Sequence, residues 1–148
     1  MELVGETGGV RLYDDFAHHP TAIKLTLSGA KAKQAVEQRT GRLVAVLEPR
    51  SNTMKLGEHK AKLAASVEDA DCTYWLEPEG LSWSLSDAVA GMPNQTVCQT
   101  IAALEAQLLK DIQAGDDVVI MSNGSFSGLH RSLLGKLKDK LEAIEVTP

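Results

Sequence analysis

The chain has 148 residues, of which 43% are hydrophobic and 24% are charged, and its formal net charge at pH 7 is -5. This length and composition are those of one ordinary globular domain that can bury a real core. A negative net charge without a Lys/Arg cluster along one face argues against nucleic acid as a partner, because such binding depends on neutralising phosphates.

Two cysteines are present, Cys72 and Cys98, and each lies in an apolar, strand-like run. We interpret them as unpaired core thiols, with a disulfide as the alternative. The first residues lack the basic and apolar regions of a signal peptide, and no apolar run approaches the ~20 residues of a membrane span. We therefore expect a cytoplasmic protein without a membrane partner.

The first elements are a pair of strands, a helix and a third strand. Residues 1–15 read as two strands joined by a turn at Gly8 and Gly9, which predicts a hairpin. Pro20 then opens a helix, a position where its missing N–H costs nothing. The apolar residues of this helix recur at helical spacing: Ile23, Leu27 and Ala30. Residues 42–47 form a continuous apolar run, typical of a strand covered on both faces.

The second half continues the alternation of helices and strands. In chain order we expect a helix over 58–67, a strand over 71–76, a short helix within 77–94 and a strand over 95–100. An amphipathic helix stopped by Gly115 follows, with apolar positions Ile101, Leu104, Leu108 and Ile112. A buried strand over 118–121 precedes a last helix with one apolar stripe: Leu129, Leu133, Leu137, Leu141 and Ile144.

Strands that alternate with helices imply βαβ crossovers. The predicted fold class is therefore α/β, with a Rossmann-like, mostly parallel sheet, helices on both faces and an N-terminal β-hairpin. We expect residues 1–148 to form a single domain. Trp75 is expected in the packed interior, and His59 and His130 are interpreted as solvent-facing or helix-surface residues.

Three predicted strands end in polar turns: YDD leads into FAHHP, VAVLE into PRSNTMK, and VVIM into SNGSFSG. Ligands of open α/β sheets bind in the crevice beyond the carboxyl ends of the strands. If the three strands run parallel, all three turns lie along one edge of the sheet. This convergence, more than any single motif, predicts a ligand site there.

The first turn crowds Asp14, Asp15, His18 and His19 together ahead of Pro20. Their spacing matches no standard zinc site, so we expect no metal ion here. Two interpretations remain. The polar residues cap the helix while the carboxylates are solvated, or they contact a substrate or nucleotide. An Asp at a strand end suits ribose hydroxyls.

The other two turns also allow two interpretations each. Arg50 can bind a carboxylate or phosphate through two parallel hydrogen bonds, or it is a surface residue ahead of a helix cap. The turn over residues 122–128 precedes a helix N-terminus, which favours anions, but it is equally a simple cap. The chain has no phosphate-loop, G-x-G-x-x-G or G-x-S-x-G pattern.

Three segments together resemble the C-terminal domain of the Mur ligases: DDFAHHPTAIKLTL, VAVLEPRSNTMKLG and VVIMSNGSFSGLHRSLL. Mur ligases are ATP-dependent amide ligases of bacterial peptidoglycan synthesis. The first segment is similar to the branch that uses UDP-N-acetylmuramate as acyl substrate. The second is similar to the members that add the murein tripeptide L-Ala-γ-D-Glu-meso-diaminopimelate in peptidoglycan recycling. The resemblance covers essentially the whole chain.

The resemblance implies a parent of three domains: an N-terminal UDP-sugar domain, a central ATPase domain with a phosphate loop, and this third domain. Because the chain has no G-K-[ST], we expect an excised third domain that lacks the other two and is inactive alone. The implied cofactors are ATP and Mg²⁺, bound mainly by the central domain. The implied substrates are UDP-N-acetylmuramate and the tripeptide.

The resemblance assigns no catalytic residue to this domain. It implies nucleotide contacts at Asp15, which matches the family's ribose-binding aspartate, and at His19. Phe16 stands where L-alanine-adding relatives have Tyr, and Met54 where they have a second Arg. We hypothesise that Arg50 grips a carboxylate of the tripeptide. The implied substrate-binding residues are Phe16, His18, Arg50, Ser51, Asn52, Thr53, Asn123, Gly124, Ser125, Phe126 and Ser127.

Two alternatives stay open. The third domain of folylpolyglutamate synthetase shares the fold, but it would lack the H-H-P and E-P-R-S-N-T motifs. A stand-alone, non-catalytic module that binds a peptide or nucleotide is also compatible, because this chain carries no phosphate loop.

Overall fold

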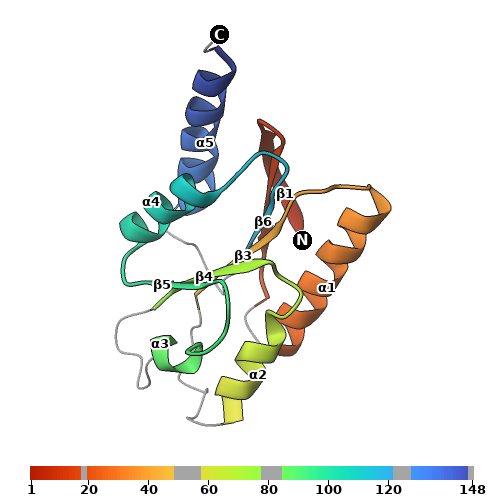
Figure 1. Cartoon of the computed structure of the whole chain (residues 1–148), viewed down its shortest axis with the longest axis vertical. Coiled ribbons are helices and arrows are strands. Elements are labelled where there is room, and N and C mark those ends of the chain that lie inside the picture. Colours follow the sequence, from red (N-terminus) through yellow and green to blue (C-terminus); the bar gives the residue numbers. More distant parts are fainter. Residues whose placement is uncertain (18–19, 49–57, 78–84, 122–127, 147–148) are drawn as a thin grey trace.

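The computed structural model describes residues 1–17, 20–48, 58–77, 85–121 and 128–146 (Figure 1). Within these residues one sheet runs in the order β1-β2-β6-β3-β4-β5. Its strands are β1 (Glu2–Thr7), β2 (Val10–Asp15), β3 (Leu43–Leu47), β4 (Cys72–Leu76), β5 (Gln95–Cys98) and β6 (Asp117–Met121). β1 and β2 form the antiparallel hairpin, and every other neighbouring pair is parallel, which confirms the predicted sheet.

Helices cover both faces of the sheet, as predicted (Figure 1). One face packs against α4 (Ile101–Asp111) and α5 (Leu129–Val146), and the other against α1 (Pro20–Val36), α2 (Glu58–Ser66) and α3 (Leu85–Ala88). The central strands β3 and β6 are buried at every position, because alternate side chains enter the two cores. None of the helices in the described part of the chain has the length and hydropathy of a membrane span.

The apolar residues predicted to line one face of α1 and of α5 are buried in the structure. α1 begins at Pro20 and buries Ile23, Leu27 and Ala30. α5 buries Leu129, Leu133, Leu137 and Leu141, while the side chain of Ile144 lies outside the described part of the structure. Trp75 is fully buried. Cys72 and Cys98 are free thiols, as predicted, and burial raises the pKa of both above its ordinary value.

The prediction that Gly115 stops α4 is wrong. The helix ends at Asp111, and the next residue, Ile112, is already extended at φ -65° and ψ 135°. Arg42 donates from Nη2 to the carbonyl oxygen of Asp111 at 2.8 Å, so a distant side chain satisfies the last turn. Gly115, at φ +94°, shapes the turn into β6, and a Cβ on Gly41 would come within 1.8 Å of its carbonyl oxygen.

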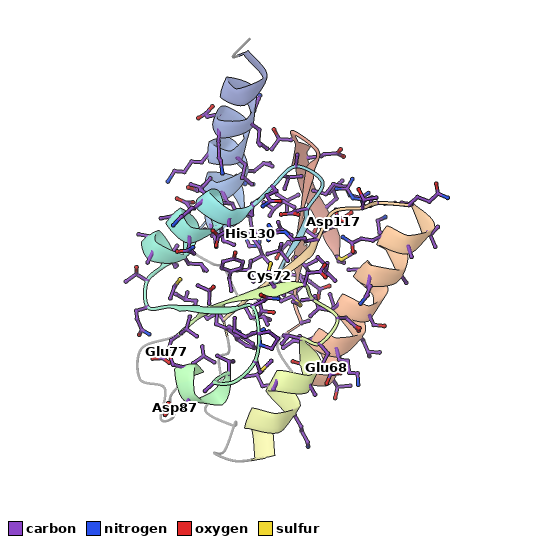
Figure 2. The ribbon with its side chains drawn as sticks, in the orientation of Figure 1. Glu68, Cys72, Glu77, Asp87, Asp117 and His130 are labelled. Carbon is purple, nitrogen blue, oxygen red and sulfur yellow. The ribbon has the colours of Figure 1, made fainter. Side chains whose placement is uncertain are left out.

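Asp117 is the first residue of β6 at the amino edge of the sheet (Figure 2). Its carboxylate and that of the preceding residue, Asp116, are both buried. Asp117 accepts hydrogen bonds from Arg11 Nε at 2.8 Å and from Arg39 Nε at 3.1 Å. Asp116 accepts one from Arg42 Nη2 at 2.7 Å. The bond to Asp117 is the main reason that the pKa of Arg11 lies above its usual value. This cluster ties β2, β6 and the segment before β3 together.

We expect Asp117→Ala to lower the free energy of unfolding by about 3–5 kcal/mol, because it leaves two largely buried guanidinium groups without their shared carboxylate. Chemical denaturation of the 148-residue chain measures this. The matched control is Asp139→Ala on the exposed side of α5, with an expected change within about 0.5 kcal/mol. Equal effects of the two substitutions would show that the Asp117 cluster does not support the fold.

Candidate functional site

The carboxyl ends of three parallel strands lie next to one another in the sheet. In its register Asp15 of β2 pairs with Met121 of β6, and Met121 pairs with Leu47 of β3. The segments that follow these strands therefore start from neighbouring points on one edge. This confirms that the three strands run parallel and end at one edge of the sheet.

The helix that follows β6, the middle strand of the three, packs on the opposite face of the sheet from the helices that follow β2 and β3. β2 and β3 are followed by α1 and α2 on one face, whereas β6 is followed by α5 on the other (Figure 1). Such a change of direction between adjacent parallel strands opens a crevice beyond their carboxyl ends. The polar turns thus start where α/β proteins bind ligands.

Most of the predicted site residues lie outside the described residues. Asp15 and Phe16 are described. The predicted site residues outside the described part of the chain are His18, His19, Arg50, Ser51, Asn52, Thr53, Asn123, Gly124, Ser125, Phe126 and Ser127. Their assignments remain predictions. Among the described side chains, no group of three or more His, Cys, Asp or Glu residues is placed to hold a metal ion.

The carboxylate of Asp15 is held in place at the end of β2. Its Oδ1 accepts the backbone N–H of Ala17 at 2.8 Å, which bends the chain out of the strand. Its Oδ2 accepts the hydroxyl of Thr26 on α1 at 3.4 Å and lies 3.1 Å from the amino nitrogen of Met1. The Asp15 side chain is only 14% exposed, so it is oriented by the protein rather than freely solvated.

Phe16 is far more exposed to solvent than the preceding residue, Asp15. With an exposed fraction of 76%, its ring adds little to the core, although it directly follows a core strand. It lies at the edge where the polar turns begin.

Asp14 and His130 form a contact that the sequence interpretation missed. His130 Nε2 lies 2.9 Å from Asp14 Oδ1, and the His130 side chain is 16% exposed. His130 therefore lies at the surface of α5, as one of the two interpretations of this residue had it, but its imidazole is mostly covered rather than solvent-facing. Figure 2 labels His130. The alternation along β2 was the available signal: Leu12 enters the core beside α5 and Tyr13 the core beside α1, so Asp14 belongs to the α5 side.

A groove of about 500 Å³ runs beside this contact. It lies between the start of β1 and the first turns of α5. Because Glu2 pairs with Asp14 in the hairpin, the groove opens at the same edge of the sheet as the polar turns. Its lining combines apolar and charged side chains, among them Leu3, Val4, Asp14, His130, Arg131 and Leu134.

The sequence of this chain matches a known protein family. Residues 1–124 match the family described as "Mur ligase, glutamate ligase domain". The chain belongs to this family. The expected resemblance to the Mur ligase C-terminal domain is thereby confirmed.

Relatives within the family are close in sequence. The chain is 43% identical over 146 residues to the UDP-N-acetylmuramate–L-alanyl-γ-D-glutamyl-meso-2,6-diaminoheptandioate ligase of Escherichia coli (strain K12). That alignment covers 98% of this chain and 31% of the relative. The chain therefore corresponds to one portion of a ligase that is much longer.

Solved structures of Mur ligases share the fold. The crystal structure of a murein peptide ligase from Psychrobacter arcticus has a TM-score of 0.81 and 45% identity, covering 94% of this chain and 30% of that one. A domain from a putative ligase of Haemophilus ducreyi, named for the same reactants, has a TM-score of 0.76 and 33% identity. The latter covers 92% of this chain and 98% of that one, so a relative's domain of this extent crystallised as a separate chain.

Proposed function

We propose that this chain is the C-terminal domain of a cytoplasmic, ATP-dependent ligase of peptidoglycan recycling. The reaction joins the murein tripeptide L-Ala-γ-D-Glu-meso-diaminopimelate to UDP-N-acetylmuramate. The observation that carries the proposal is the 43% identity, over 98% of this chain, to a ligase whose name states these reactants. The same match favours this reaction over that of a folylpolyglutamate synthetase.

The proposed chemistry proceeds in two steps. The muramyl carboxylate attacks the γ-phosphorus of ATP, which yields an acyl phosphate and releases ADP. The free amine of the tripeptide's L-Ala then attacks the acyl carbon, loses a proton and displaces inorganic phosphate. Because water would hydrolyse the acyl phosphate, the reaction requires an enclosed site.

The proposal gives this domain the task of binding and closing rather than catalysis. The Mg²⁺ ion and the ATP phosphates are assigned to the central domain of a longer protein, as the family resemblance implies. The edge formed by the three strand ends then faces the N-terminal and central domains. The exposed ring of Phe16 at this edge is compatible with such a contact.

Asp15 is the described residue best suited to hold the nucleotide. A carboxylate offers about four lone-pair directions, and the contacts with Ala17 and Thr26 occupy two of them. Its fixed orientation lowers the entropy cost of accepting a ribose hydroxyl. Arg50, which follows β3, is proposed to pair with a carboxylate of the tripeptide in the bidentate manner that guanidinium favours.

The proposed function predicts ligation by the complete polypeptide that carries this domain. With ATP, Mg²⁺, UDP-N-acetylmuramate and the tripeptide, we expect equimolar ADP and UDP-N-acetylmuramyl-tripeptide, measured by chromatography and mass spectrometry. Omitting ATP should abolish the product, and the 148-residue chain alone should yield none. Failure of the complete polypeptide to ligate would refute the proposal, and ligation by the chain alone would refute the division of labour.

The nucleotide role predicts that Asp15→Asn raises the KM for ATP about ten- to a hundredfold, the loss expected for a hydrogen bond to a charged group. Thr26→Val is the matched control, because it removes a structural partner of Asp15 and leaves the carboxylate in place. Steady-state kinetics at varied ATP measures both. A KM effect of Thr26→Val as large as that of Asp15→Asn would mean that Asp15 acts through the fold alone.

The tripeptide role predicts that Arg50→Ala lowers kcat/KM for the tripeptide by the equivalent of roughly 1.5–3 kcal/mol, with the KM for ATP unchanged. Arg50→Lys should recover part of this loss, because lysine keeps the charge without the planar fork. The same kinetic assay at varied tripeptide provides the measurement. Unchanged kinetics in Arg50→Ala would remove this residue from the site.

A further inference from the structure

Two consecutive carboxylates at the end of β2 are tied to helices on opposite faces of the sheet. Asp15 binds the hydroxyl of Thr26 on α1, and Asp14 contacts the imidazole of His130 on α5. The alternation of side chains along a strand makes this division possible. The end of β2 is thus held from both sides.

The Asp14–His130 contact links the strand that precedes one polar segment to the helix that follows another. Asp14 lies just ahead of the turn that follows β2, and His130 lies in the first turn of α5, just after the segment that follows β6. The two residues are 116 positions apart in the sequence.

The charges around this contact limit its contribution to stability. The Asp14 side chain is 36% exposed, and Glu2 and Arg131 line the same groove. Glu2 is also the hairpin partner of Asp14. Partly exposed polar contacts contribute little to the free energy of folding, but they restrict the orientation of the groups they join. The contact is therefore better suited to set local geometry than to hold the fold.

We propose that His130 is a positioning residue for the ligase reaction, acting through Asp14. By holding Asp14 against the start of α5, it fixes the direction in which the chain leaves β2 and thereby places Asp15 and Phe16. The inference rests on the proposed function for its effect on catalysis. The contact itself can be tested without it.

The first test uses amide hydrogen exchange of the 148-residue chain, followed by NMR. The Ala17 N–H reports on the end of β2, since it donates to Asp15. We expect His130→Ala to speed its exchange about three- to tenfold, within the range of coupling between contacting residues. The Asp117 N–H, which donates to the carbonyl of Arg42 at the far edge, should be unaffected. Equal acceleration at both amides, or none at Ala17, would overturn the proposal.

The second test is a double-mutant cycle in the complete ligase. We expect His130→Ala and Asp14→Ala each to raise the KM for ATP about three- to tenfold, and the double variant to add nothing further. His130→Gln retains an N–H donor near Nε2 and should restore the KM. Lys138→Ala, at an exposed position farther along α5, is the control and should be neutral. Additive effects, or a failure of His130→Gln to rescue, would overturn the positioning role.

The two tests separate this proposal from the proposed function. If the wild-type polypeptide does not ligate, the proposed function fails, while exchange at Ala17 still decides whether His130 positions the end of β2. If the wild type ligates and His130→Ala has normal kinetics, the positioning role fails and the proposed function stands.

Discussion

The position of β6 depends on the buried carboxylates at its start. β6 is the last strand in the sequence, yet it lies between β2 and β3, so it must pair correctly on both sides. Asp117 is opposite Arg11 in the sheet register and binds its guanidinium as well as that of Arg39. A shifted register would leave these buried charges apart, which costs several kcal/mol per ion. The cluster therefore selects one register among those that the apolar residues alone would allow.

The register at the start of β6 also determines which residues are neighbours at the opposite edge of the sheet, where the strands end. Because parallel strands carry their register along their length, the pairing of Asp117 with Arg11 also brings Met121 beside Asp15. The same strand brings Met121 beside Leu47 on its other side. The pairing at the amino ends thus contributes to bringing the three strand ends together. The charged cluster that stabilises the fold in this sense also helps to assemble the candidate site.

Along β2, the residues that form the core and the residues proposed to bind a ligand occupy different positions. Apolar side chains of the strands enter the two cores, and Asp14 and Asp15 come where β2 leaves them. These carboxylates are anchored by His130, Thr26 and a backbone N–H rather than by the core. In the proposed function, this edge orients a ligand and faces the central ATPase domain.

The local sequence by itself determined the α/β alternation, the start of α1 at Pro20, and the strand ends where polar residues gather. Apolar periodicity and proline geometry act over a few residues, so they can be read from a short window. Only the tertiary structure decided where α4 ends, because Arg42 satisfies the last carbonyl of that helix from far along the chain. It alone also brought His130 to Asp14 and Arg11 to Asp117, 116 and 106 positions apart. No local pattern specifies such partners, since their pairing depends on how the whole sheet is assembled.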